Sequence, residues 1–81
     1  MNPPRLTFYT RRDCHLCEAA HQVLQRVRGR GAVFVLDIFD VDSDPALQAL
    51  YGTQVPVLLV DAKKFAKVRI DERRLARKLG V

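Results

Sequence analysis

The spacing of apolar residues changes several times along the chain, and each change marks the border of a predicted element. In residues 5–10 apolar and polar positions alternate, and β-branched and aromatic residues dominate, as is typical of a strand. In residues 14–28 the apolar positions recur every three or four residues, which predicts a helix that Asp13 could cap. Residues 33–41 are almost continuously apolar, which favours a strand buried on both faces of a parallel sheet.

The second half of the chain contains four further predicted elements. Pro45 stands at the first position of a second helix, which Gly52 ends. Residues 55–60 have the composition of another buried strand. Residues 64–70 alternate imperfectly, as a one-sided edge strand would, and residues 71–80 predict a last helix that begins with an aspartate cap and ends at a glycine.

The order of these elements is strand, helix, strand, helix, strand, strand, helix (βαβαββα). The first three form a right-handed parallel crossover, and the last two strands are close enough in sequence to require an antiparallel hairpin. The chain is therefore predicted to be an α/β protein, with a four-stranded mixed sheet and three helices on its faces. Because it has 81 residues and no repeat or linker, residues 1–81 are expected to form a single domain.

Composition restricts the class of protein further. Apolar residues make up 48% of the chain and charged residues 28%, so we expect a packed core rather than disorder. No apolar run approaches the ~20 residues of a membrane span, and the N-terminus lacks a signal-type stretch, so we expect a cytoplasmic monomer with no membrane partner. Two cysteines cannot form a disulfide-rich scaffold, which indicates local chemistry instead.

The net charge of +5 comes from 14 lysine and arginine residues against 9 acidic ones, and the basic excess is uneven. Residues 63–78 contain eight basic and two acidic residues, whereas residues 37–44 contain four aspartates and no base. One hypothesis is a nucleic-acid surface. We favour a solvated edge strand and the polar face of a terminal helix, because Phe65 is the only aromatic residue there that could stack on bases. A third hypothesis is a surface that steers anionic partners, such as acidic proteins or glutathione.

The feature most specific for chemistry is the pair Cys14 and Cys17, which follows the first predicted strand and begins the first helix. Unpaired backbone N–H groups and the helix dipole stabilise negative charge there, and the thiolate is the nucleophile of thiol–disulfide exchange. The positive charges of Arg11 and Arg12, just before the helix, would also stabilise a thiolate there. Cys14 is predicted to attack a disulfide, and Cys17, in phase with the apolar stripe, to resolve the mixed disulfide. The alternative is two small buried residues without reactivity.

Three other polar residues leave their roles open. His15, if charged, would stabilise a thiolate at Cys14; otherwise it is an exposed loop residue. Asp37 could accept a proton from Cys17, but an exposed strand end is favoured because a buried unpaired carboxylate is costly. His21 lies away from the apolar phase of its helix, which predicts a surface position.

Five segments together match the motifs of one protein family: Leu6-Thr7-Phe8-Tyr9-Thr10, Cys14-His15-Leu16-Cys17, Asp40-Val41-Asp42, Tyr51-Gly52 and Val55-Pro56-Val57-Leu58. Over residues 6–79 the chain resembles small glutaredoxin-like proteins of the thioredoxin-fold superfamily. The resemblance implies a thioredoxin-like fold and thiol–disulfide oxidoreductase activity. It also implies a cis peptide before Pro56, which would place the backbone of Val55 beside Cys14. The substrate-binding residues that it implies are Arg11, Val55 and Pro56, with Arg11 standing where the family meets a glutathione carboxylate. We add His15 to the expected substrate-binding residues because it lies between the two cysteines.

The chain also departs from the family pattern. His15 and Leu16 stand where the family has proline and an aromatic residue, and Gln54 replaces the usual threonine before the Val-Pro pair. No glycine pair precedes the last helix, where the family binds the γ-glutamyl end of glutathione, although Asp71 stands near a late acidic contact. We expect no resident cofactor, and either a disulfide-containing protein or glutathione as the partner, with glutathione as a candidate co-substrate.

Metal binding is the main rival hypothesis. Cys14, Cys17 and His21 resemble part of a zinc ligand set, but a structural zinc site needs four ligands and the chain has no second Cys or His pair. We therefore predict no metal ligands. The alternative to an oxidoreductase is a metal-binding or non-catalytic thioredoxin-fold binding module.

Overall fold

The computed structural model describes residues 2–81 and contains the seven predicted elements in the predicted order, with one added turn of 3-10 helix. The elements are β1 (Arg5–Thr10), α1 (His15–Gly29), β2 (Val35–Asp40), η1 (Val41–Ser43), α2 (Pro45–Tyr51), β3 (Val57–Val60), β4 (Lys63–Lys67) and α3 (Glu72–Lys78). No helix within these residues has both the length and the apolar composition needed to cross a bilayer.

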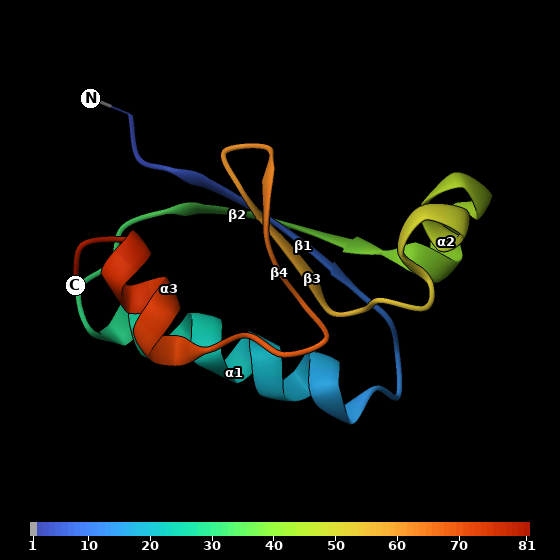
Figure 1. Ribbon diagram of the computed structural model, residues 1–81, viewed down its shortest axis with the longest axis horizontal. Coiled ribbons are helices and arrows are strands. Elements are labelled where there is room, and N and C mark those ends of the chain that lie inside the picture. Colours follow the sequence, from blue (N-terminus) through green and yellow to red (C-terminus); the bar gives the residue numbers. More distant parts are fainter. Residues whose placement is uncertain (1) are drawn as a thin grey trace.

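The four strands form one mixed sheet in the order β2-β1-β3-β4 (Figure 1). β1 pairs with β2 in parallel, which requires the crossover through α1, and with β3 in antiparallel orientation. β3 and β4 form the expected antiparallel hairpin, with a register shift between Leu58 and Leu59. The predicted α/β class and mixed sheet are confirmed.

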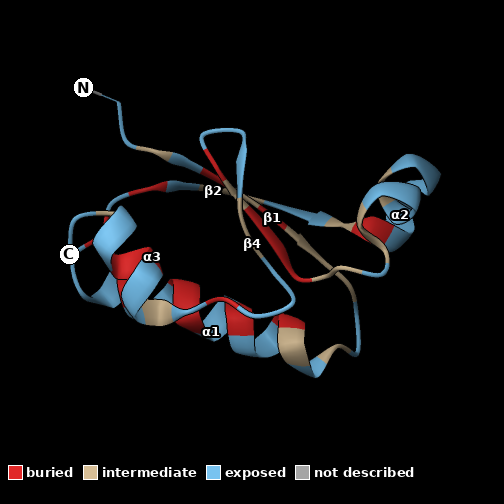
Figure 2. Ribbon diagram, in the orientation of Figure 1, coloured by how far each residue is buried: buried red, intermediate tan, exposed pale blue. Residues whose placement is uncertain are grey.

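The core lies between the sheet and the two helices α1 and α3, which share one face of it. α1 contributes a stripe of buried side chains to this core. The first buried residue of the stripe is Cys17. Figure 2 shows this buried stripe on the side of α1 that faces the strands. The stripe packs on alternate residues of the two central strands, Leu6 and Phe8 of β1 and Leu58 and Val60 of β3. The central members of the core are fully buried because they are covered by helices on one side and strands on the other.

The second strand was expected to be buried on both faces of the sheet, and this expectation is wrong. β2 is an edge strand, and its Ile38 and Phe39 side chains are 52% and 43% exposed. The helices α1 and α3 lie on the same face of the sheet, whereas α2 lies at the end of the sheet and buries no residue fully (Figure 1). α2 meets the other face through Tyr51, whose ring stacks on Tyr9 at 4.4 Å between centroids. The apolar run therefore identifies a parallel strand, but it does not indicate a covered one.

The last strand is shorter than the sequence predicts. β4 ends at Lys67 because Val68 adopts a left-handed backbone conformation, with φ of 67°. Its N–H donates to the carbonyl oxygens of Pro56 at 2.7 Å and Gln54 at 3.1 Å. A β-branched residue disfavours this conformation, so these two hydrogen bonds offset local strain. They connect the end of the hairpin to the loop before β3.

The packing of α1 on the sheet makes a stability prediction. Leu24 is fully buried in the stripe, whereas Leu50 on α2 is 62% exposed. Leu24→Ala should lower the free energy of unfolding by about 2–5 kcal/mol, because it removes buried methylene groups and leaves a cavity. Leu50→Ala should change it by less than about 0.5 kcal/mol. Urea unfolding followed by far-UV circular dichroism measures both, and equal losses would contradict the assignment of the core.

Candidate active site

Cys14 is the N-cap residue of α1, so its sulfur lies directly at the start of the helix. Its backbone is extended, and its Sγ accepts a hydrogen bond from the Cys17 N–H at 3.2 Å. The sequence predicted Asp13 as the cap; instead, Asp13 adopts a left-handed conformation with φ of 54° and turns the chain into the helix. The start of the helix thus places a backbone N–H donor directly on the Cys14 sulfur.

The two cysteines differ in exposure in the direction that the sequence predicted. Both are free thiols; Cys14 is half-buried, whereas only 2% of Cys17 is exposed. Burial raises the pKa of the Cys17 thiol, and its hydrogen bond with Cys14 acts in the same direction. Hydrogen bonds from the Thr10 side chain and the Arg11 backbone oppose this rise and offset it in part. At neutral pH Cys17 is therefore a protonated thiol beneath a more accessible Cys14.

Thr10 is a site residue that sequence reasoning missed. It ends β1 and lines the same hollow as Cys17, and its hydroxyl lowers the pKa of the Cys17 thiol against the effect of burial. The available signal was its position, because the last residue of the first strand and the first turn of the following helix lie side by side after a short loop. A hydroxyl there can donate to a Cys17 thiolate as it forms.

Arg11 holds together three segments that surround the cysteines. Its guanidinium binds both carboxylate oxygens of Asp42, at 2.8 and 3.1 Å, and donates to the carbonyl oxygen of Gly52 at 2.8 Å. The bond to Arg11 lowers the pKa of Asp42, and the same bond raises the pKa of Arg11. A methyl group added at Gly52 would collide with the carbonyl oxygen of Gln48, so the close turn at the end of α2 requires glycine. The predicted contact of Arg11 with substrate stays a prediction, and its clear role here is positional.

The Val55–Pro56 peptide bond is cis, as the resemblance implied. Pro56 is buried and Val55 is half-buried, and the following residue begins β3. The pairing of the Val55 backbone with a substrate chain stays a prediction. His15 is the exposed first residue of α1, next to Cys14 in sequence, and its role also stays a prediction.

Two other candidate residues are placed clearly. Asp37 forms an ion pair with Arg5 at 2.6 Å, at the end of β1 opposite to the cysteines, so the proposal that it accepts a proton from Cys17 is wrong. His21 is exposed, as predicted, but its ring also stacks on Phe8 with 6.3 Å between centroids. It lines a hollow of about 230 Å³ together with Cys17, which the helical phase alone did not indicate.

A metal site needs several ligating side chains close together. Nowhere in residues 2–81 do three or more His, Cys, Asp or Glu side chains gather closely enough to hold an ion. Cys14, Cys17 and His21 thus do not form the partial zinc set that their spacing suggested.

The fold and the site together define a thioredoxin-like protein with two cysteines at the start of its first helix, one helical turn apart. The family model described as a glutaredoxin-like domain (DUF836) matches residues 5–80, and the chain belongs to this family.

The chain is also similar to several solved structures and to curated proteins. A structural-genomics target protein from X. campestris is 36% identical, with a TM-score of 0.71 over 93% of this chain and 95% of that one. A protein from Nitrosomonas europaea is 30% identical, with a TM-score of 0.75 over 98% and 94%. A mutant thioredoxin from Halobacterium salinarum shares the fold, with a TM-score of 0.68 and 24% identity over 96% and 73%. An uncharacterized protein of Mycobacterium tuberculosis is 29% identical over 93% of this chain and 81% of its own.

The difference between the cysteines predicts selective alkylation. Iodoacetamide at pH 7 should modify Cys14 and leave Cys17 largely unmodified, because Cys17 is buried and its pKa is raised. Peptide mass mapping after a short exposure of the reduced protein measures this selectivity, with the urea-unfolded protein as the control in which both react. Faster modification of Cys17 than of Cys14 in the folded protein would contradict the assignment.

The Arg11–Asp42 pair predicts a pH-dependent contribution to stability. The pKa of Asp42 is lowered in the folded protein relative to about 3.9 for an unperturbed aspartate, so the contribution is complete above that value and is lost as pH falls through the folded pKa. Asp42→Asn should therefore destabilise the protein at pH 7, and its difference from wild type should shrink below about pH 4.

Urea unfolding at stepped pH measures this difference. Asp13→Asn is the matched control, because it removes a carboxylate from the same end of the molecule without removing a bond to Arg11. A difference between Asp42→Asn and wild type that stayed constant down to pH 2 would show that the ion pair is not the source.

Proposed function

We propose that this protein is a thiol–disulfide oxidoreductase that uses the Cys14/Cys17 pair. The observation that carries the proposal is the capping bond from the Cys17 N–H to Cys14 Sγ at 3.2 Å, with the Cys17 thiol buried beneath. A nucleophilic sulfur held at a helix start and a protonated partner one turn away are the two parts that dithiol exchange needs. Membership of a glutaredoxin-like family supports the same activity.

The proposed reaction has two exchange steps. The Cys14 thiolate attacks one sulfur of a substrate disulfide, which forms a mixed disulfide and releases the other substrate sulfur as a thiolate. Cys17 then loses its proton and attacks Cys14 Sγ, which forms the Cys14–Cys17 disulfide and releases the second substrate sulfur. The substrate gains two electrons and, with two protons, becomes two thiols. A low-molecular-weight thiol such as glutathione, or a dithiol protein, would return the pair to its reduced form.

Groups near the sulfur of Cys17 would assist the second step. The hydrogen bond from Thr10 and the N–H of Arg11 stabilise negative charge on Cys17, and these two bonds lower the barrier that burial imposes on its deprotonation. The ion pair of Arg11 with Asp42 fixes the loop that supplies this N–H. We further propose that a protein disulfide is the substrate and that the reaction takes place in a reducing compartment, the cytoplasm.

The proposal is tested by equilibrating the protein in glutathione buffers of stepped ratio, trapping free thiols by alkylation and measuring intact mass. The wild type should lose two hydrogens reversibly, and the Cys17→Ser variant should accumulate one glutathione adduct on Cys14 because nothing resolves it. Cys14→Ser is the control and should accumulate far less adduct, since its remaining thiol is buried. Cysteines that stay reduced at every ratio, or that hold a metal after purification, would overturn the proposal.

A further inference from the structure

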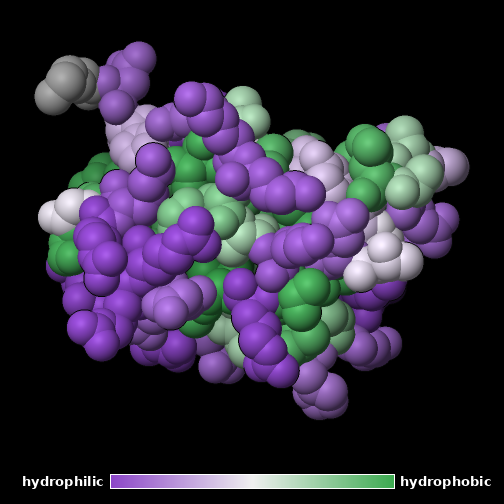
Figure 3. Space-filling model, in the orientation of Figure 1, coloured by the Kyte–Doolittle hydropathy of each residue, from purple (hydrophilic) through white to green (hydrophobic). Residues whose placement is uncertain are grey.

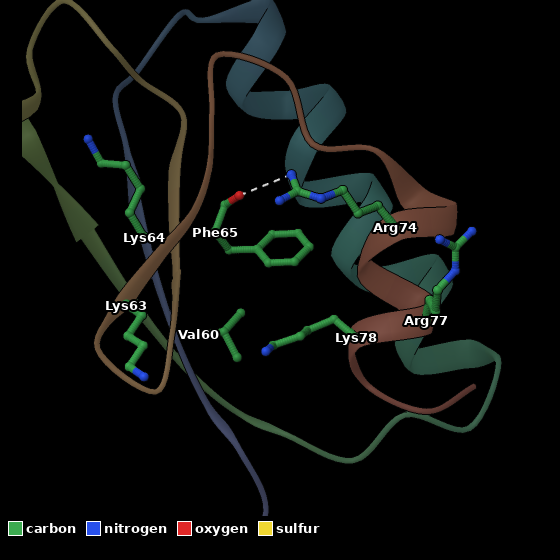
Figure 4. A pocket seen from close by; sticks show the side chains of 7 residues that line it. All are labelled: Val60, Lys63, Lys64, Phe65, Arg74, Arg77 and Lys78. Carbon is green, nitrogen blue, oxygen red and sulfur yellow. Dashed lines mark hydrogen bonds between the residues drawn. The ribbon is translucent and has the colours of Figure 1, made fainter.

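A basic groove lies between the β3–β4 hairpin and α3, away from the cysteines. Its volume is about 430 Å³, and its apolar floor is formed by Val60 and Phe65. Figure 4 shows lysines of the hairpin on one side and cationic side chains of α3 on the other, with Phe65 between them. In Figure 3 hydrophilic side chains surround an apolar area over this part of the molecule. The cationic residues that line the groove are Lys63, Lys64, Arg74, Arg77 and Lys78.

No carboxylate within residues 2–81 pairs with any of these five cations. The ion pairs of the described chain involve Arg5, Arg11, Arg26 and Arg30 only. The acidic residues nearest in sequence are used elsewhere. Asp61 accepts the N–H of Arg5, Asp71 caps α3 by accepting the N–H of Arg74, and Glu72 pairs with Arg26 and Arg30. The groove therefore presents uncompensated positive charge over an apolar floor.

The groove continues toward the cysteines. A second hollow along β4 shares Lys64, Phe65 and Arg74 with it and adds Lys67 and Arg69. A third hollow shares Arg69 with the second. It is lined by Val68, Ile70 and Asp71 on one side and by residues of α1 on the other, the first of which is Leu16, between the two cysteines. Shared lining residues thus join the three hollows into a track that is basic along the edge of the sheet and mostly apolar, with one carboxylate, where it reaches α1.

The shape and chemistry of this track favour an extended polypeptide. β4 is an edge strand, so no strand of this sheet pairs with its outer side, although the Phe65 carbonyl already accepts a hydrogen bond from the Arg74 guanidinium at 3.2 Å. Single-stranded nucleic acid needs exposed aromatic faces, whereas Phe65 is half-buried and the Arg74 guanidinium covers its ring at 4.5 Å. The acidic segment of a second copy is a poor fit, because Asp40 and Asp44 accept backbone N–H groups and Asp42 is held by Arg11.

We propose that this basic track binds an extended acidic segment of the protein whose disulfide the cysteines exchange. The inference rests on the proposed function and adds the class of substrate: a disulfide-bearing protein with glutamate or aspartate residues in the extended segment that leads to its reactive cysteine. The cations attract the acidic segment, and the track leads its disulfide to the end of the molecule that bears Cys14.

The first test measures binding of a short fluorescein-labelled peptide of alternating glutamate and glycine by anisotropy, with the glutamine peptide as its control. Arg77→Glu, in the groove, should weaken binding of the acidic peptide by about fivefold or more at low salt. Arg73→Glu is the matched variant, because it makes the same change of charge on the same helix at an exposed residue that lines no part of the groove. It should bind the peptide almost as wild type does.

Several outcomes would overturn the proposal. Equal losses in Arg77→Glu and Arg73→Glu would show attraction by net charge alone. Tighter binding of an unrelated single-stranded or duplex oligonucleotide would indicate a nucleic-acid surface, and saturable binding of inorganic triphosphate without binding of the peptide would indicate a small-anion site. A mass that rises with concentration in sedimentation, in place of peptide binding, would indicate that a second copy occupies the groove.

A second measurement separates this inference from the proposed function. The ratio of kcat/KM for a disulfide carried on the acidic peptide to that for the same disulfide on the glutamine peptide should exceed one in the wild type and fall in Arg77→Glu. Binding of the reduced acidic peptide should persist in Cys14→Ser, which cannot exchange disulfides. Peptide binding without disulfide exchange in the wild type would contradict the proposed oxidoreductase activity but support the proposed binding of acidic peptides. Disulfide exchange with a ratio of one would support the activity and contradict the role of the track.

Discussion

The packing of one stripe of α1 against the central strands determines where both sulfur atoms lie. Cys17 belongs to the same buried stripe as Leu24 and Val27, so the contacts that stabilise the core also fix its depth and direction. Cys14 stands three residues earlier in the sequence, immediately before the first residue of the helix, and is its N-cap. The difference in exposure between Cys14 and Cys17 is thus a consequence of how α1 packs on the core.

The surroundings of the sulfurs come from segments far apart in sequence. Arg11 precedes the cysteines, whereas its partners Asp42 and Gly52 follow β2 and α2. The carbonyl oxygens of Gln54 and Pro56, in the loop between α2 and β3, accept the N–H of Val68 at the end of the hairpin. Two sets of hydrogen bonds therefore join the loops at this end of the sheet to one another.

Sequence patterns predicted the order of elements, the mixed sheet and the pair of cysteines, because these depend on local periodicity and on chain connectivity. The cis peptide before Pro56 came only from the resemblance to a family. Exposure of β2 was not predictable from its apolar run. Ile38 lies on the face of the sheet that α1 covers and Phe39 lies on the other face, and tertiary packing alone decides whether a helix reaches either of them. The roles of Thr10 and Asp42 were missed for a similar reason: each depends on a partner that tertiary structure alone brings near.

The position of α2 has a further consequence for how the molecule fluctuates. This helix of seven residues buries none of them fully, packs chiefly against η1, and is joined to the sheet by the Tyr51–Tyr9 stack and the bond from Arg11 to Gly52. Its amides can therefore exchange with solvent through local opening that leaves α1 and the sheet intact. Such opening breaks the bond from Arg11 to the Gly52 carbonyl and frees the start of the loop that leads to Pro56.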